Sequence, residues 1–113
     1  MEKRLLDLSV QVVEFGINLR KDPLYWSITD QLIRSTTSIG ANFIEAKAAS
    51  STNDYVRFLQ YALKSANESI YWLSIVKKTT PVHVTTIMIL TTETKEISLI
   101  LGKSIVTLKS KKT

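Results

Sequence analysis

The sequence predicts an all-α fold, a single antiparallel up-down-up-down four-helix bundle that occupies residues 1–113. Apolar residues recur every three or four positions along most of the chain, which is the spacing of one helical face. Glycine (3) and proline (2) are scarce, which disfavours turn-rich β architectures. Turn signals divide the chain into four long stretches, and short connections between long helices make neighbours antiparallel. A chain of 113 residues is enough for one domain.

The first predicted helix covers residues 2–21 and ends before Pro23, which disfavours helical geometry at the preceding residue. Its inner face is apolar at the spacing of one helical stripe. This face consists of Leu5, Leu8, Val12, Phe15 and Leu19. Because Leu6, Val13 and Ile17 extend it, the apolar surface is wider than one seam.

The second predicted helix covers residues 27–48, with Ser27 as its N-cap and Asp30 completing a capping box. Gly40 lies in the middle, where glycine costs about 1 kcal/mol relative to alanine. A bend or a close contact with another helix would explain this glycine. The inner face consists of Ile28, Leu32, Ser35, Ile39 and Phe43.

The third predicted helix covers residues 53–78 and follows a second capping-box pattern, Ser51 to Asp54. Two stripes run along it, about 100° apart around the helix axis. One stripe suits a bundle core and consists of Leu59, Leu63, Ala66, Ile70 and Leu73. The other is aromatic and partly polar and consists of Phe58, Tyr61, Ser65, Glu68 and Trp72.

The fourth predicted helix covers residues 84–108, with apolar positions at helical spacing from Ile87 to Leu108. The β-branched run 82–89 also suits a strand, but no other stretch offers a strand partner. We therefore expect a helix that is frayed before Ile87, followed by a disordered tail over residues 109–113.

Composition disfavours several kinds of chemistry. The chain has no cysteine and one histidine, so thiolate nucleophiles, disulfides and histidine-rich zinc sites are not expected. Neither a phosphate-binding glycine loop nor a catalytic triad motif is found. We expect a protein that is not an enzyme and has no cofactor or metal. The first five residues do not resemble a secretion signal and no apolar run suits a membrane span, which predicts a cytoplasmic protein without membrane contact.

A row of polar residues follows one side of the second helix, and two further polar residues lie on the third. This polar row consists of Gln31, Arg34, Ser38, Asn42, Glu45, Ser65 and Glu68. If Arg34 is buried, it needs a carboxylate partner, and Glu45 and Glu68 are the candidates. The row suits a hydrogen-bonded network that fixes helix register or subunit orientation, and a direct ligand or RNA contact is the alternative. Catalysis is disfavoured because two glutamates lack a nucleophile or metal partner.

The aromatic stripe of the third helix, Phe58, Tyr61 and Trp72, offers a second candidate surface. If the other stripe fills the core, these rings form an exposed patch. Patches of this kind usually mark protein interfaces, so self-association is the leading interpretation. Plain core packing and base stacking remain alternatives.

Four lysines near the C-terminus, Lys103, Lys109, Lys111 and Lys112, are not balanced by any acidic residue after residue 102. Basic runs attract phosphate backbones, although they also keep small domains in solution. The chain as a whole carries a formal net charge of +5. We therefore consider these lysines as nucleic-acid contacts, whose effect would multiply if several copies assembled.

Two segments resemble a known family. Residues 31–46 read QLIRSTTSIGANFIEA and are similar to the signature Q-x-x-R-A-x-x-S-I-P-x-N-I-A-E-G. Residues 55–68 read YVRFLQYALKSANE and are similar to F-x-x-F-L-x-x-A-x-G-S-x-x-E. Both patterns belong to bacterial four-helix bundle proteins of the 23S rRNA intervening-sequence type. The departures from the patterns include Ser35, Gly40, Ala46 and Lys64, whereas the polar row is retained.

The resemblance implies a homo-oligomeric bundle, a pentameric ring or barrel with a central channel, and no known enzymatic activity. A related branch comprises accessory proteins of diversity-generating retroelements, which bind a reverse transcriptase and nucleic acid. The leading hypothesis is therefore a self-associating bundle that presents basic surfaces to RNA or DNA. The alternative is a protein-binding adaptor, or an accessory subunit of an enzyme such as a reverse transcriptase, that makes no nucleic-acid contact itself.

Overall fold

The computed structural model describes residues 1–111 and contains four α-helices and one short 3-10 helix. No strand occurs in this part of the chain, which confirms the all-α prediction. The elements are α1 (Glu2–Leu19), η1 (Pro23–Tyr25), α2 (Trp26–Lys47), α3 (Thr52–Thr79) and α4 (Val84–Lys111).

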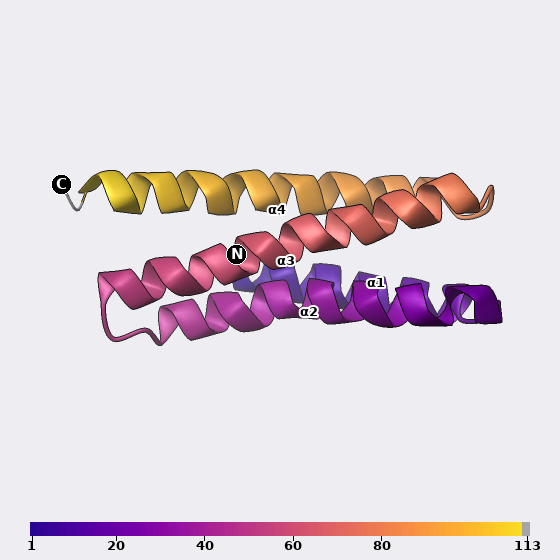
Figure 1. The fold of residues 1–113 in the computed structure, drawn as a ribbon, viewed down its shortest axis with the longest axis horizontal. Coiled ribbons are helices and arrows are strands. Elements are labelled where there is room, and N and C mark those ends of the chain that lie inside the picture. The colour runs from indigo at the N-terminus through magenta and orange to yellow at the C-terminus, as the bar shows by residue number, and fades with distance from the viewer. Residues whose placement is uncertain (112–113) are drawn as a thin grey trace.

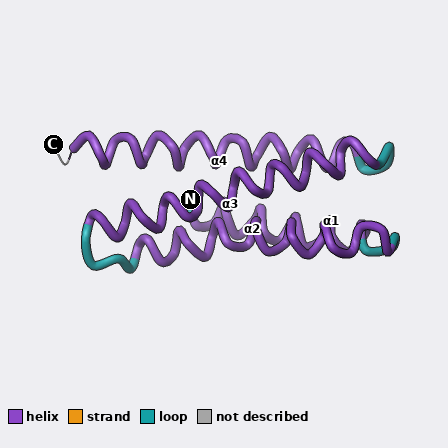
Figure 2. The backbone as a smooth tube through the Cα atoms, viewed as in Figure 1, coloured by secondary structure: helices purple, strands orange, loops and turns teal. Residues whose placement is uncertain are grey.

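The helices form an elongated bundle that measures 50 × 21 × 20 Å (Figure 1). The α2–α3 connection lies at one end, whereas the α1–α2 and α3–α4 connections lie at the other (Figure 2). Contacts are extensive between α2 and α3, between α3 and α4 and between α1 and α2, but sparse between α1 and α4. The bundle therefore has three well-packed seams and one loose seam.

Every helix contributes to one apolar core. The five residues expected on the inner face of the first helix are all buried. From the other helices, Leu32, Ile39, Leu73, Ile87 and Ile97 are fully buried. At about 25 cal/mol per Å² of apolar surface, this continuous burial is the main driving force for folding.

The start of α2 differs from the sequence prediction. Asp22 caps the 3-10 helix by accepting a hydrogen bond from the backbone N–H of Leu24 at 3.0 Å. Because that turn continues directly into α2 at Trp26, the helix begins before Ser27, and the predicted Ser27 cap is wrong. Asp30 instead forms an ion pair with Arg20.

The α3 start follows the prediction, since the Ser51 hydroxyl accepts a hydrogen bond from the backbone N–H of Asp54 at 3.1 Å. For α4, two expectations are wrong. The helix is formed from Val84 rather than frayed before Ile87, and it continues through Lys109 to Lys111 rather than ending in a disordered tail. Residues 112–113 lie outside the described part of the chain.

Gly16 of α1 lies at a close approach of α1 to α2. A Cβ atom at this position would lie 3.0 Å from Ile33 Cδ1 of α2, which is too close without movement of the isoleucine. A Cβ atom on Gly40 would lie 3.6 Å from Leu5 Cβ, an ordinary contact. The helix contact that the sequence suggested for Gly40 is therefore looser than the contact at Gly16.

Candidate functional site

A buried cluster of hydroxyl groups sets the register of α2 against α3. The Oγ atoms of Ser35 and Ser69 lie 2.8 Å apart, and the Thr36 hydroxyl donates to Ser69 Oγ at 3.2 Å. The Ser69 hydroxyl also donates to the backbone carbonyl of Ser65 at 2.9 Å. Ser35, Thr36 and Ser69 are buried, and their polar atoms are all satisfied. Small side chains and internal hydrogen bonds therefore let these two helices approach closely.

The polar row is divided between half-buried and exposed side chains. Gln31, Ser38, Asn42 and Ser65 are half-buried, whereas Arg34, Glu45 and Glu68 are exposed. Two of these side chains bond within their own helix. The Ser38 hydroxyl donates to the carbonyl of Arg34 at 2.7 Å, and the Asn42 amide donates to the carbonyl of Ser38 at 2.9 Å.

The buried ion pair considered for Arg34 is not formed. Arg34 is exposed, and within residues 1–111 no ion pair joins it to Glu45 or Glu68. Since an exposed guanidinium is solvated by water, it has no need of a carboxylate partner. Arg34 is therefore available for contacts outside the chain.

The aromatic stripe is less exposed than the sequence suggested. Phe58 and Trp72 are half-buried and pack against the core, while Tyr61 is 44% exposed. The Trp72 indole N–H donates to Glu68 at 3.0 Å. Tyr71, which lies outside the predicted stripe, is 60% exposed and has its ring 5.3 Å from that of Trp72. On α3, the exposed aromatic surface therefore lies at Tyr61 and Tyr71.

An aliphatic strip on the outer side of α1 is a further surface. Leu6 and Ile17 are each 64% exposed, with the half-exposed Val10 and Val13 between them. Leu6 and Ile44 of α2 line an apolar hollow of about 310 Å³. The sequence signal was the width of the apolar face of α1, which exceeds what one seam can bury. Contiguous apolar surface of this kind is typical of interaction sites.

The loose seam between α1 and α4 contains a groove. One hollow of about 730 Å³ reaches from Arg4 to Gln11, and a second of about 360 Å³ reaches from Gln11 to His83. Arg4 bridges the first hollow, since its Nε and Nη2 atoms each lie 2.7 Å from a carboxylate oxygen of Glu93. These hydrogen bonds lower the pKa of Glu93. At the other end, the ring of His83 lies edge-on to Phe15 at 5.7 Å.

The C-terminal lysines occupy a helix rather than a flexible tail. Lys103 lines a hollow of about 480 Å³ beside Tyr55, and Lys109 and Lys111 are exposed in the last turn of α4. At about 100° per residue, Lys103 and Lys111 point to one side and Lys109 to another. Lys112 lies outside the described residues.

Other kinds of site find no support in residues 1–111. This part of the chain has no group of three or more metal-ligating side chains. None of its helices combines the length and hydropathy of a membrane span.

The comparisons with known proteins agree with the fold. The family model of the 23S rRNA-intervening sequence protein matches residues 2–103. A crystal structure from Bacteroides thetaiotaomicron, described as a protein of unknown function from the S23 ribosomal protein family, is 32% identical with a TM-score of 0.86. The match covers 92% of this chain and 96% of that one. The curated proteins include no match, and neither description above names a catalytic activity. The chain therefore belongs to the 23S rRNA-intervening sequence protein family.

Proposed function

We propose that this protein is a non-enzymatic bundle whose copies associate, as an antiparallel four-helix unit, into a pentameric ring that presents lysines to RNA or DNA. The observation that carries the proposal is the amount of uncovered apolar surface. Leu6 and Ile17 of α1, Tyr71 of α3 and Leu99 of α4 are each at least 60% exposed. A small domain with such side chains on several helices hides them best against copies of itself.

Light scattering coupled to size exclusion tests the association. We expect a mass that is a multiple of 12.8 kDa, with five as the multiple that the resemblance implies. A monomer of 12.8 kDa at all concentrations would contradict the proposal.

Arg34→Ala separates an interface role from a structural role. Because Arg34 is exposed and unpaired within residues 1–111, its loss should change the free energy of unfolding by less than about 0.5 kcal/mol. The association should weaken, because arginine is among the residues enriched at interfaces. Lys95→Ala on α4 is the matched control, since Lys95 is exposed and outside the polar row. If the Arg34→Ala variant is a destabilised monomer, or if its association is unchanged, Arg34 does not belong to the interface.

Nucleic-acid contact by the lysines is supported by their exposure and by the absence of an ion pair on Lys103, Lys109 or Lys111 in the described chain. Binding to duplex DNA should weaken with salt, by a log–log slope of about −0.9 for each phosphate contact. Substituting these three lysines by glutamine should reduce that slope while α4 stays helical, and Lys95→Gln should leave it unchanged. Failure of the wild-type protein to bind duplex or single strands at low salt would contradict this part of the proposal.

The aliphatic strip of α1 suits the second candidate, a protein-binding adaptor, as well as it suits self-association. Its four exposed residues, from Leu6 to Ile17, carry no phosphate-binding group and suit an apolar protein surface. An oligomer that binds a protein encoded nearby, and that shows no salt-dependent nucleic-acid binding, would support this adaptor instead.

A further inference from the structure

The groove between α1 and α4 is apolar along its floor. Its two hollows, of about 730 and 360 Å³, are adjacent, since both are lined by Gln11 and Ile89. Met88 and Ile89 of α4 are 54% and 57% exposed there. Large apolar side chains that line a groove are characteristic of a docking site for a helix.

The rim of this groove is acidic in a chain of net charge +5. Its lining includes four carboxylates and one guanidinium. Arg4 is engaged by Glu93 and Glu96, whereas Asp7 and Glu14 are exposed and have no ion pair within residues 1–111. The negative charge of Asp7 and Glu14 is thus uncompensated, and it favours a cationic occupant over a phosphate backbone.

The outer side of α3 has the complementary chemistry. Four exposed side chains lie along it, separated by three, seven and seven residues. They are Tyr61, Lys64, Tyr71 and Lys78, and we call them the α3 strip. Neither lysine has an ion pair in the described residues, and the glutamate between the tyrosines, Glu68, accepts the Trp72 N–H. The strip therefore combines exposed rings with free ammonium groups.

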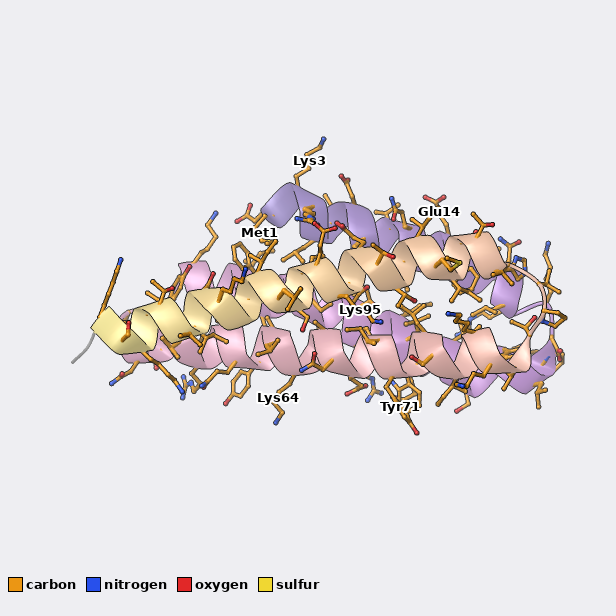
Figure 3. The ribbon with its side chains drawn as sticks, turned by 90° about the horizontal axis from the view of Figure 1, so that it is seen from above. Met1, Lys3, Glu14, Lys64, Tyr71 and Lys95 are labelled. Carbon is orange, nitrogen blue, oxygen red and sulfur yellow. The ribbon has the colours of Figure 1, made fainter. Side chains whose placement is uncertain are left out.

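The spacing of the two surfaces allows one close charge pair. Asp7 and Glu14 are seven residues apart on α1, about 10.5 Å, whereas Lys64 and Lys78 are fourteen residues apart on α3, about 21 Å, so one lysine at a time can face this pair of carboxylates. Figure 3 shows Glu14 on one side of the molecule and Lys64 and Tyr71 projecting from the opposite side. Surfaces on opposite sides cannot meet within one copy, but they can join copies head to tail, in a ring or a filament.

We infer that the α1–α4 groove receives the α3 strip of a second copy, with Lys64 facing Glu14 and tyrosine rings entering the apolar hollows. This inference rests on the proposed self-association and names the two surfaces that meet. It also makes the contact heterologous, so that every copy gives its α3 strip to one neighbour and its groove to another.

Charge reversal tests the contact on the full-length protein. Glu14→Lys changes the groove and Lys64→Glu changes the α3 strip, and neither side chain has an ion pair or side-chain hydrogen bond in the described residues that would affect folding. Each single variant should raise the concentration of half-association by about tenfold or more in sedimentation measurements, since like charges then face each other. Lys95→Glu, an equal charge change on α4, is the control and should raise it by less than about threefold.

The double variant Glu14→Lys, Lys64→Glu restores opposite charges and should associate within about threefold of wild type. An equimolar mixture of the two single variants should also associate, into open or even-numbered assemblies in which the two variants alternate, because each then supplies the surface that the other lacks. If wild type associates but both single variants match it, this pairing of surfaces is wrong while self-association stands. If the double variant and the mixture stay dissociated, the two surfaces do not meet. A monomeric wild type would instead overturn the proposed function itself.

Discussion

The α2–α3 seam and the α1–α4 seam of this bundle are built in opposite ways. Between α2 and α3, the small side chains of Ser35, Thr36 and Ser69 are buried and hydrogen-bonded to one another. Between α1 and α4, larger side chains such as Met88 and Ile89 line an open groove that Arg4 bridges with an ion pair to Glu93. The α2–α3 seam is thus packed by small polar residues, whereas the α1–α4 seam is bridged by a partly exposed ion pair.

If copies associate as proposed, this difference separates the stability of the fold from the recognition of a partner. A closed seam with satisfied hydroxyl groups contributes to a unique register, because any shift would leave buried polar atoms unpaired. An open seam keeps apolar and charged groups in reach of a partner, at some cost in packing. We therefore expect mutations in the two seams to affect different measurements.

The largest expected effect is that of Ser69→Leu in the closed seam. Ser69 is fully buried, so a leucine would overpack the seam and remove the acceptor of Thr36. We expect a loss of about 3 kcal/mol in the free energy of unfolding, measured with urea. Thr92→Leu on the exposed rim of the open seam is the matched control and should change it by less than about 0.5 kcal/mol. Equal losses in both variants would show that the two seams are packed alike.

A smaller effect is expected for Arg4→Met in the open seam. The arginine has two hydrogen bonds to Glu93 at 2.7 Å, but its side chain is 33% exposed, so solvent screens the pair. The free energy of unfolding should fall by about 1 kcal/mol or less. Amide exchange should accelerate in α1 more than in α3. A uniform acceleration across all four helices would mean that the ion pair supports the whole fold rather than this seam.

The smallest expected effect concerns pH. The hydrogen bonds from Arg4 lower the folded-state pKa of Glu93 below its ordinary value. The resulting stabilisation is present above the pKa of an unfolded glutamate, about 4.3, and is lost as the pH falls through the lower folded-state pKa. The stability difference between wild type and Glu93→Gln should therefore shrink between pH 7 and about pH 3. A constant difference over this range would show that the carboxylate charge contributes nothing.

The apolar periodicity of the sequence predicted the four helices and much of the core, because burial in the structure follows that periodicity closely. The inner face of α1 and the Ser51 cap of α3 are determined by local spacing, which a sequence displays directly. The Ser27 cap was wrong because a 3-10 turn at Pro23 supplies helical geometry, so that the N-cap of α2 is Tyr25, two residues earlier than the capping pattern indicates. Helix starts depend on what precedes them as well as on the capping residue.

The candidate surfaces were harder to predict, because exposure depends on the register between helices. Ser35 was assigned to the inner face, but its partner Ser69 lies 34 residues away and has no local signal. Tyr71 was missed because Trp72, one residue later, fits the stripe pattern better, yet Tyr71 is the more exposed ring. The α1–α4 groove depends on how far two helices at opposite ends of the chain stand apart, which helical periodicity does not encode.

The unequal sharing of contacts among the helices has a consequence for motion. The two central helices each have extensive neighbours on both sides, whereas α1 and α4 each have one extensive neighbour and share only the loose seam. The α2–α3 hairpin should therefore be the last part of the chain to lose amide protection, and the outer helices should open first. The molecule would then behave as a rigid α2–α3 hairpin with two more mobile outer helices, so that the proposed groove would widen and narrow while the α3 strip keeps its shape.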